Sequence, residues 1–349
     1  MRIAQLAPLT ESVPPQTYGG TELVVQLLTE GLVAAGHEVT LFASGDSVTS
    51  AELVAGSPRA LRLDESVPMR RWPAYSMKQL LEFEKRQDEF DVVHNHMGYE
   101  AFATLKRIGC PSITTNHNPI KDYCAPLYLA YADLNYVCIS NAYKQLNYPS
   151  DINYVATVHN GIDVTQYLPN GHKPSRSYLL FIGRVCHDKG TAVAIDIAKK
   201  IGLPLKIAGK VDTADKEYFD TLVSPQLNSP QIEYLGEVDF QQKLELYKGA
   251  IAVVYPIAFD EPFGLVIAEA IASGTPVLAL ERGSVPELIK DGETGIVAKT
   301  PEELVRRFAE IEKISPEFCS QYAQNNFSKE KMVSEYIKAY ETYANKCSN

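Results

Sequence analysis

Residues 178–208 read YLLFIGRVCHDKGTAVAIDIAKKIGLPLKIA, a short apolar run, a longer amphipathic stretch and a second apolar run. Strand, helix and strand in that order predict a parallel βαβ unit. Two cations, Arg184 and Lys189, follow the first run, which puts them at the sheet edge where open α/β folds bind ligands. Solvated surface cations are the alternative interpretation. The position directly after a strand favours a binding role.

The same alternation extends through the rest of the chain. Further short β-rich runs lie at residues 2–6, 38–42, 91–94, 111–115, 136–139, 154–158, 232–235, 250–255, 276–280 and 295–297. A polar, turn-rich stretch at 168–177 separates two series of such runs. Because 349 residues exceed what one core usually supports, we predict an α/β chain of two doubly wound Rossmann-like domains, 1–170 and 171–325. Residues 326–349 carry a terminal helical pattern.

Charge and composition exclude several classes of protein. The formal net charge of -10 repels nucleic-acid backbones and anionic lipid, so we expect neither a nucleic-acid partner nor stable membrane association. No basic leader with a long apolar core starts the sequence, and no apolar stretch approaches about 18 residues. The six cysteines form no CxxC pair and are expected to be reduced. These features predict a cytoplasmic protein.

Residues 260–269, DEPFGLVIAE, place two carboxylates around the start of a predicted helix. With a helix that begins near Phe263, Glu261 lies in the loop before it and Glu269 lies about two turns inside. The first backbone amides of such a helix can bind an anion or sugar hydroxyls; they belong to Phe263, Gly264 and Leu265. A glutamate in this place can also serve only to compensate the helix dipole.

A glycine pair and three histidines are further candidates in the first half. Gly19 and Gly20 end a long, proline-rich loop before a helical pattern, where bare backbone can approach a phosphate, although a tight turn is an equal alternative. His117 follows the strand-like run 111–115 and is read as an active-site side chain rather than a structural one. His94 and His96, two positions apart on a strand, should point to opposite faces, which disfavours a metal site and leaves packing or acceptor binding.

These motifs together resemble the family-4 retaining glycosyltransferases, which have the GT-B fold. The resemblance rests on several segments in the family's order: Gly19-Gly20, Asn160-Gly161-Ile162-Asp163, Gly183-Arg184 with Lys189-Gly190, the pair Glu261 and Glu269, and Gly283-Ser284-Val285-Pro286-Glu287. One departure concerns Thr17-Tyr18, where glycogen and starch synthases carry a lysine before the glycine pair. A polymer synthase that uses ADP-glucose is therefore disfavoured.

The resemblance implies roles for the candidate residues. The first domain would bind the acceptor, the second the nucleotide-sugar donor, with a cleft between them, and the terminal helix would return to the first domain. Glu261 would hold hydroxyls of the transferred sugar, and Glu269 would accept both ribose hydroxyls. His117, Arg184 and Lys189 would act at the reacting centre, where the two cations neutralise the diphosphate. The donor-binding set is Gly19, Gly20, Gly183, Val238, Phe263, Gly264, Leu265, Val266 and Glu269.

The implied reaction transfers a hexosyl unit from a UDP-sugar, or a GDP-sugar, to a soluble small molecule or saccharide, with front-face retention. No metal or other cofactor is expected, because Arg184 and Lys189 supply positive charge and the sequence has no Asp-x-Asp motif. A nucleotide-sugar epimerase or hydrolase on the same fold, or a catalytically silent nucleotide-sugar binding protein, remains an alternative. The acceptor, the linkage and the oligomeric state are not encoded in these motifs.

Overall fold

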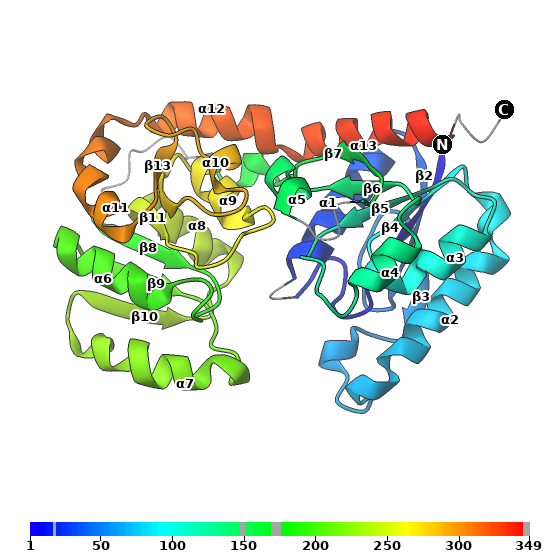
Figure 1. Cartoon of the computed structure of the whole chain (residues 1–349), viewed down its shortest axis with the longest axis horizontal. Helices are drawn as coiled ribbons and strands as arrows, with labels where there is room; N and C mark the ends of the chain where they lie inside the picture. Colours follow the sequence, from blue (N-terminus) through cyan, green and yellow to red (C-terminus); the bar gives the residue numbers. More distant parts are fainter. Residues whose placement is uncertain (17–18, 147–150, 169–175, 345–349) are drawn as a thin grey trace. The chain divides into compact units, whose positions relative to one another are not determined.

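The computed structural model describes residues 1–16, 19–146, 151–168 and 176–344. The chain divides into two compact units, Met1–Gly161 with Lys329–Asn349, and Ile162–Ser328 (Figure 1). The expected domain boundary at residues 170 and 171 lies outside the described residues. The second unit begins before it, at Ile162, and the terminal segment joins the first unit from Lys329 rather than from residue 326.

Over its described residues, the first unit is built on a seven-stranded parallel sheet in the order β3-β2-β1-β4-β5-β6-β7. The strands are β1 (Arg2–Leu6), β2 (Glu38–Ser44), β3 (Glu52–Ser57), β4 (Val92–Asn95), β5 (Ser112–Asn116), β6 (Tyr136–Cys138) and β7 (Tyr154–Thr157). The helices are α1 (Gly20–Ala34), α2 (Trp72–Lys85), α3 (Phe102–Arg107), α4 (Ala125–Ala130), α5 (Asn141–Leu146) and α13 (Lys329–Ala344). Aromatic side chains such as Phe42, Phe83 and Phe102 fill the core beside the sheet.

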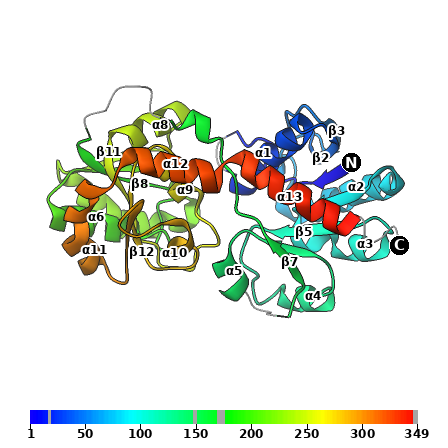
Figure 2. The same cartoon turned by 90° about the horizontal axis from the view of Figure 1, so that it is seen from above.

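The terminal helix α13 packs against α1 within this unit (Figure 2). Met332, Tyr336 and Tyr340 recur at a spacing of four residues on one face of α13, and all three are buried. The two helices approach closely at Gly31, where an added Cβ atom would lie 2.4 Å from Val333 Cγ2. The two ends of the chain therefore build one core.

The second unit repeats the architecture, with a six-stranded parallel sheet in the order β10-β9-β8-β11-β12-β13 over its described residues. Its strands are β8 (Tyr178–Ile182), β9 (Leu205–Ala208), β10 (Ile232–Gly236), β11 (Ala250–Tyr255), β12 (Val277–Leu280) and β13 (Gly295–Ala298). Its helices are α6 (Thr191–Ile201), α7 (Lys216–Tyr218), α8 (Phe240–Gly249), α9 (Leu265–Ala272), α10 (Val285–Leu288), α11 (Pro301–Arg307) and α12 (Pro316–Phe327). In each sheet the first three strands are added toward one edge and the later strands toward the other edge, as in doubly wound folds.

These sheets confirm the predicted α/β architecture, and every strand expected from an apolar run is present within two residues. Strand β3 was not predicted, because its residues ELVAGS contain a glycine and two polar ends. Helix α9 begins at Leu265 and not near Phe263, so the predicted start was too early. Gly264 has φ +88°, a left-handed conformation that cannot continue a right-handed helix.

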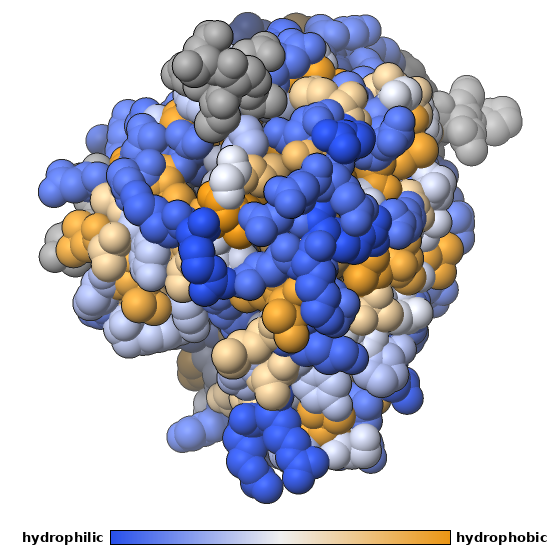
Figure 3. Space-filling view, turned by 90° about the vertical axis from the view of Figure 1, so that its right-hand side faces the viewer, coloured by the Kyte–Doolittle hydropathy of each residue, from blue (hydrophilic) through white to orange (hydrophobic). Residues whose placement is uncertain are grey.

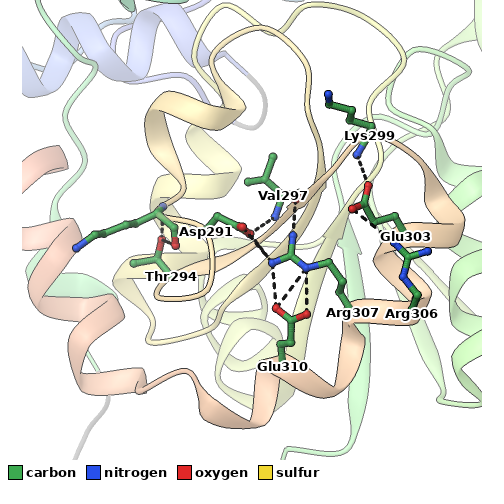
Figure 4. Close-up of polar contacts among 9 residues, drawn as sticks. Asp291, Thr294, Val297, Lys299, Glu303, Arg306, Arg307 and Glu310 are labelled. Atoms are coloured by element: carbon green, nitrogen blue, oxygen red, sulfur yellow. Dashed lines mark hydrogen bonds and ion pairs between the residues drawn. The ribbon is translucent and has the colours of Figure 1, made fainter.

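An arginine fastens α11 to the end of the second sheet (Figure 4). Arg307 donates to the Val297 carbonyl oxygen at 2.9 Å and forms ion pairs with Asp291 at 3.0 Å and Glu310 at 2.9 Å. These two carboxylates raise the pKa of Arg307, so its charge is permanent. The cluster is a local structural contact, because the partners of Arg307 are 3, 10 and 16 positions away along the chain.

Hydrophobic residues on the face shown in Figure 3 are scattered among hydrophilic ones, which is ordinary for a folded protein surface. None of the helices in the described part of the chain has the length and apolar character needed to cross a bilayer.

Candidate functional site

Glu261 lies in the loop after β11 and is held by two side chains. Lys189 Nζ, from the loop after β8, is 2.5 Å from Glu261 Oε2, and the Tyr255 hydroxyl donates to the same oxygen at 2.7 Å. Because β8 and β11 are neighbours in the sheet, residues 72 positions apart meet at its carboxyl edge. The Glu261 side chain is 12% exposed, so a ligand can still reach this carboxylate.

A second segment fixes the backbone of Glu261. The Ser284 amide donates to the Glu261 carbonyl oxygen at 2.9 Å, and the Gly283 amide donates to Asp260 Oδ1 at 3.1 Å. An added Cβ atom on Gly283, which has φ +50°, would lie 2.4 Å from the Glu261 nitrogen. Glycine at 283 therefore permits the close approach that orients the Glu261 loop.

The start of α9 offers backbone amides beside this carboxylate. Gly264 precedes the helix. The first backbone amides that have no carbonyl acceptor within the helix therefore belong to Leu265 and Val266. Phe263, expected to contribute an amide from inside the helix, instead lies before it with a side chain buried against Phe327. The amides available to an anion are thus shifted toward Val266.

Glu269 lies one turn inside α9, not two, and its carboxylate is buried. Oε1 accepts from the Tyr167 hydroxyl at 3.0 Å and from Lys243 Nζ at 2.8 Å, and Oε2 accepts from the Tyr247 hydroxyl at 2.8 Å. Burial, together with the Glu269 charge, raises the pKa of Tyr247 well above its usual value. Three of about four lone-pair positions of the carboxylate are occupied by protein donors.

The sequence analysis missed these partners of Glu269. Lys243 and Tyr247 are four residues apart on α8, which places them on one helix face, and this spacing is the one local signal that could have linked them. The ammonium group of Lys243 also lies 5.8 Å from the centroid of the Tyr167 ring. Nothing in the sequence near Tyr167 indicates that it meets α9.

Arg184 follows Gly183 after the end of β8, and its guanidinium lies close to two carboxylates. Its guanidinium lies 3.5 Å from Asp212 and 3.6 Å from Asp215, and Asp212 also pairs with Lys210 at 3.0 Å. Both cations predicted from the sequence, Arg184 and Lys189, therefore have acidic partners in this structure. Val238, the expected base-contacting residue, lies in the segment between β10 and α8, at the same carboxyl edge of the sheet.

In the first unit, His117 follows β5 and is hydrogen-bonded to His96, with 2.9 Å between His117 Nε2 and His96 Nδ1. His96 Nε2 is in turn 2.7 Å from Gln5 Oε1, and Gln5 Nε2 donates to the Tyr340 hydroxyl at 3.1 Å. The Tyr340 hydroxyl is 2.7 Å from His94 Nδ1. A continuous hydrogen-bonded chain thus runs from His117 to the terminal helix.

His94 and His96 do not point to opposite faces as expected, because their ring centroids are 3.9 Å apart. β4 ends at Asn95, so His96 lies beyond the strand. The alternation of side chains between the two faces of the sheet therefore does not apply to it. No group of three His, Cys, Asp or Glu side chains suited to a metal ion occurs among the described residues.

The hydrogen-bond chain determines which nitrogen of His117 carries the proton. Burial lowers the pKa of His117 to about 4 and the pKa of His96 well below its usual value, so both rings are neutral at pH 7. Gln5 Oε1 can only accept, so His96 donates to it from Nε2 and accepts at Nδ1 from His117 Nε2–H. His117 Nδ1 is then the unprotonated nitrogen, available to accept from a ligand hydroxyl.

Gly19 and Gly20 lie at the start of α1, and residues 17 and 18 before them are outside the described residues. An added Cβ atom on Gly19 would lie 2.7 Å from Pro15 Cβ, so the glycine allows the loop to fold tightly onto the helix. Glu22 in the first turn of α1 is buried, and burial is the main cause that raises its pKa. Gly19 therefore has a packing role in this unit.

Two family models match the chain over nearly its whole length. Residues 168–341 match glycosyl transferases group 1, and residues 18–166 match glycosyltransferase family 4. An uncharacterized glycosyltransferase of Methanocaldococcus jannaschii is 28% identical over 335 residues, covering 84% of each chain. A D-inositol 3-phosphate glycosyltransferase of an Arthrobacter species is 26% identical over 335 residues, covering 80% of this chain and 78% of the relative.

Solved structures resemble the chain in the same way. Sucrose-phosphate synthase from Thermosynechococcus elongatus superposes with a TM-score of 0.80 at 19% identity, covering 98% of both chains. An Anabaena protein solved in complex with UDP-glucose superposes with a TM-score of 0.73 at 15% identity, covering 98% of this chain and 100% of the other. These likenesses extend over both units.

Proposed function

The chain belongs to the glycosyl transferases group 1 family and has the GT-B fold, and from this premise we propose that it transfers a hexosyl unit from a UDP-sugar with retention of configuration. A GDP-sugar is the second choice of donor, and the acceptor is a soluble small molecule or saccharide. The observation that carries the proposal is the cluster of Glu261, Lys189 and Tyr255 at the carboxyl edge of the second sheet.

The donor is assigned to this edge of the second unit. Gly183 and Arg184 follow β8, Lys189 precedes α6, and the first amides of α9 lie beside Glu261. Cations and helix amides are the groups that bind diphosphates in proteins. The complex of the Anabaena protein with UDP-glucose supports a UDP-sugar as the first donor to test.

Lys189 and Arg184 are proposed to stabilise the departing diphosphate. Negative charge grows on the leaving phosphate as the glycosidic bond breaks, and fixed cations near it lower the barrier. Both cations pair with carboxylates in the structure described, so the diphosphate must draw them away from Glu261, Asp212 and Asp215. The charge that a divalent cation would supply is then provided by these two side chains.

Glu261 is proposed to orient the transferred sugar rather than to attack it. Its Oε2 accepts from the Tyr255 hydroxyl, a hydrogen bond that remains after Lys189 has moved to the diphosphate and that lowers the strength of this oxygen as a nucleophile. Front-face displacement, in which the leaving phosphate oxygen takes the proton of the acceptor, accounts for retention without a covalent intermediate. In the first unit, His117 is proposed to offer its unprotonated Nδ1 to a hydroxyl of a ligand.

Glu269 is proposed to bind ribose through its one remaining lone-pair position. Binding both ribose hydroxyls, as expected from the sequence, requires one protein donor to leave. Lys243 is the donor suited to move, because its side chain is 22% exposed and flexible, whereas Tyr247 is fully buried.

The test is nucleoside diphosphate release from a panel of UDP-, GDP- and ADP-sugars, measured by mass spectrometry with and without EDTA. One donor should be consumed, EDTA should not slow the reaction, and Glu261→Gln should lower the rate by about 10²- to 10³-fold. Glu217→Gln, which alters an exposed carboxylate on α7, is the matched control and should keep the wild-type rate.

Each other outcome selects an alternative. An epimerised donor without release of the diphosphate identifies an epimerase, and binding without any turnover identifies a silent binding protein. Turnover that stops in EDTA contradicts the metal-independent mechanism.

A further inference from the structure

A cavity of about 260 Å³ lies within the first unit at the carboxyl edge of its sheet. Residues that line it include Thr10, Trp72, Ser76, Met97, Tyr99 and Glu100. This volume is just below the range of about 300–1,000 Å³ typical of pockets for larger organic ligands. The cavity therefore suits a ligand of about one sugar ring.

Its position relates it to His117. Thr10 follows β1 and Met97 follows β4, while His117 follows β5, and these three strands are consecutive in the sheet. Met97 is also the residue directly after His96, which is hydrogen-bonded to His117. The cavity and the unprotonated nitrogen of His117 thus belong to one edge of one sheet.

The side chains that line the cavity include two aromatic rings and several polar groups that form no hydrogen bond or ion pair with the described residues. The Trp72 indole donates to the Val67 carbonyl oxygen at 3.3 Å, which satisfies its polar edge, and the Tyr99 side chain is exposed. Within the described parts of the chain, the hydroxyls of Thr10 and Ser76 and the carboxylate of Glu100 make no hydrogen bond or ion pair. Aromatic faces with hydroxyl and carboxylate acceptors match a ring that carries CH groups and hydroxyls.

The charge of the cavity lining favours an uncharged ring over a phosphate ester. Among the described residues, no lysine, arginine or histidine lines the cavity, and Glu100 contributes a negative charge. The arginine that follows lining residue Leu61 is Arg62, and its guanidinium is engaged by the buried carboxylate of Glu11. A phosphate in this cavity would meet a like charge without a cation to offset it.

We propose that this cavity binds the glycosyl acceptor and selects an uncharged, hydroxyl-rich ring over its phosphate ester. The inference rests on the proposed transferase function, and it distinguishes this chain from the relative named for D-inositol 3-phosphate. Trp72 and Tyr99 supply faces for the ring, and Glu100 accepts from one of its hydroxyls.

The chain has one tryptophan, which makes Trp72 a direct reporter of the cavity. The experiment titrates the full chain, without donor, with glucose, mannose, galactose and myo-inositol and with the monophosphate ester of each. Emission is excited where tyrosine does not absorb. We expect a saturable change with at least one neutral ring and at least tenfold weaker binding of its ester.

Two variants with the same change of charge sharpen the test. Glu100→Gln should weaken binding of the neutral ring and reduce its preference over the ester by at least threefold. Glu65→Gln, at an exposed carboxylate that does not line the cavity, should change neither. Equal melting temperatures for both variants would show that they are folded.

An ester that binds as tightly as the neutral ring, or no saturable response to any neutral ring, overturns the inference. Donor turnover measured on the same preparation separates this failure from failure of the proposed function. Turnover without a Trp72 response contradicts only the acceptor site, whereas a Trp72 response without turnover contradicts the transferase and leaves a sugar-binding site.

Discussion

The carboxylate of Glu261 illustrates what single residues reveal and what they do not. Its place before an apolar helix, eight positions from Glu269, predicted a ligand-binding role from the sequence. Its partner Lys189 could be joined to it only by the strand order, because β8 and β11 are neighbours although 72 residues separate Lys189 from Glu261. The same limit applies to Glu269, whose three donors come from two separate segments, Tyr167 from one and Lys243 and Tyr247 from α8.

The buried histidines predict how the stability of the first unit depends on pH. The folded-state pKa of His117 is lowered to about 4, below the ordinary value of 6.5, because the ring is buried. As pH falls through 6.5, the unfolded chain therefore takes up protons that the folded chain does not, and stability is lost. His117 alone accounts for about 3 kcal/mol between neutral pH and pH 4.

Urea unfolding between pH 7 and pH 5, followed by the emission of Trp72 in the first unit, measures this effect. His117→Gln should flatten the pH dependence, whereas His187→Gln, which changes an exposed ring in the second unit, should leave it as it is. An unchanged slope in His117→Gln would refute the assignment of a neutral buried ring.

At the scale of elements, the start of α9 depends on one glycine. Gly264 has φ +88°, and an added Cβ atom would lie 3.2 Å from Ile267 Cδ1 and 3.3 Å from the Tyr255 hydroxyl. Gly264→Ala should cost about 1–2 kcal/mol of unfolding free energy and should also lower donor turnover, because it moves the first helix amides away from Glu261.

Gly292→Ala is the matched control. Gly292 has φ +78° in the same unit, but an added Cβ atom there meets nothing within 4 Å. This variant should lose similar stability and keep full turnover, as measured by thermal unfolding and nucleoside diphosphate release. Equal turnover in both variants would show that the position of the α9 amides does not matter.

Strand β3 shows why some elements could not be predicted. Its pattern is weakened by Gly56, yet that glycine is needed because an added Cβ atom would lie 2.3 Å from Gln79 Oε1 on α2. Because α2 packs closely on β3, position 56 holds a glycine, and an apolar residue that would have indicated a strand is absent there. The remaining strands were predicted because each contains a short run rich in strand-forming residues that alternates with longer amphipathic stretches.

For the molecule as a whole, the terminal helix ties the last described residues to the first strand. The Tyr340 hydroxyl accepts from Gln5 on β1 and is 2.7 Å from His94 on β4. Tyr340→Phe removes the partner of Gln5 Nε2 and of His94 Nδ1, both buried, and should cost about 1–3 kcal/mol.

Urea unfolding monitored at Trp72 measures this cost, and Tyr123→Phe, at a side chain that is 77% exposed, is its control. Equal stability of the two variants would mean that the hydrogen-bond chain from His117 to α13 contributes nothing to the first unit. The sequence predicted the terminal helix, but a helical pattern does not identify polar partners on β1 and β4.

The central claim is that this chain moves a sugar from a nucleoside diphosphate with retention and without a metal ion. Proton NMR of the reaction in EDTA tests it most directly, because the coupling constant of the anomeric proton reports the configuration of donor and product in one sample. The account predicts a glycosylated product with the anomeric configuration of the donor, formed at the same rate with or without EDTA. A product of inverted configuration, or no product in EDTA, would contradict it.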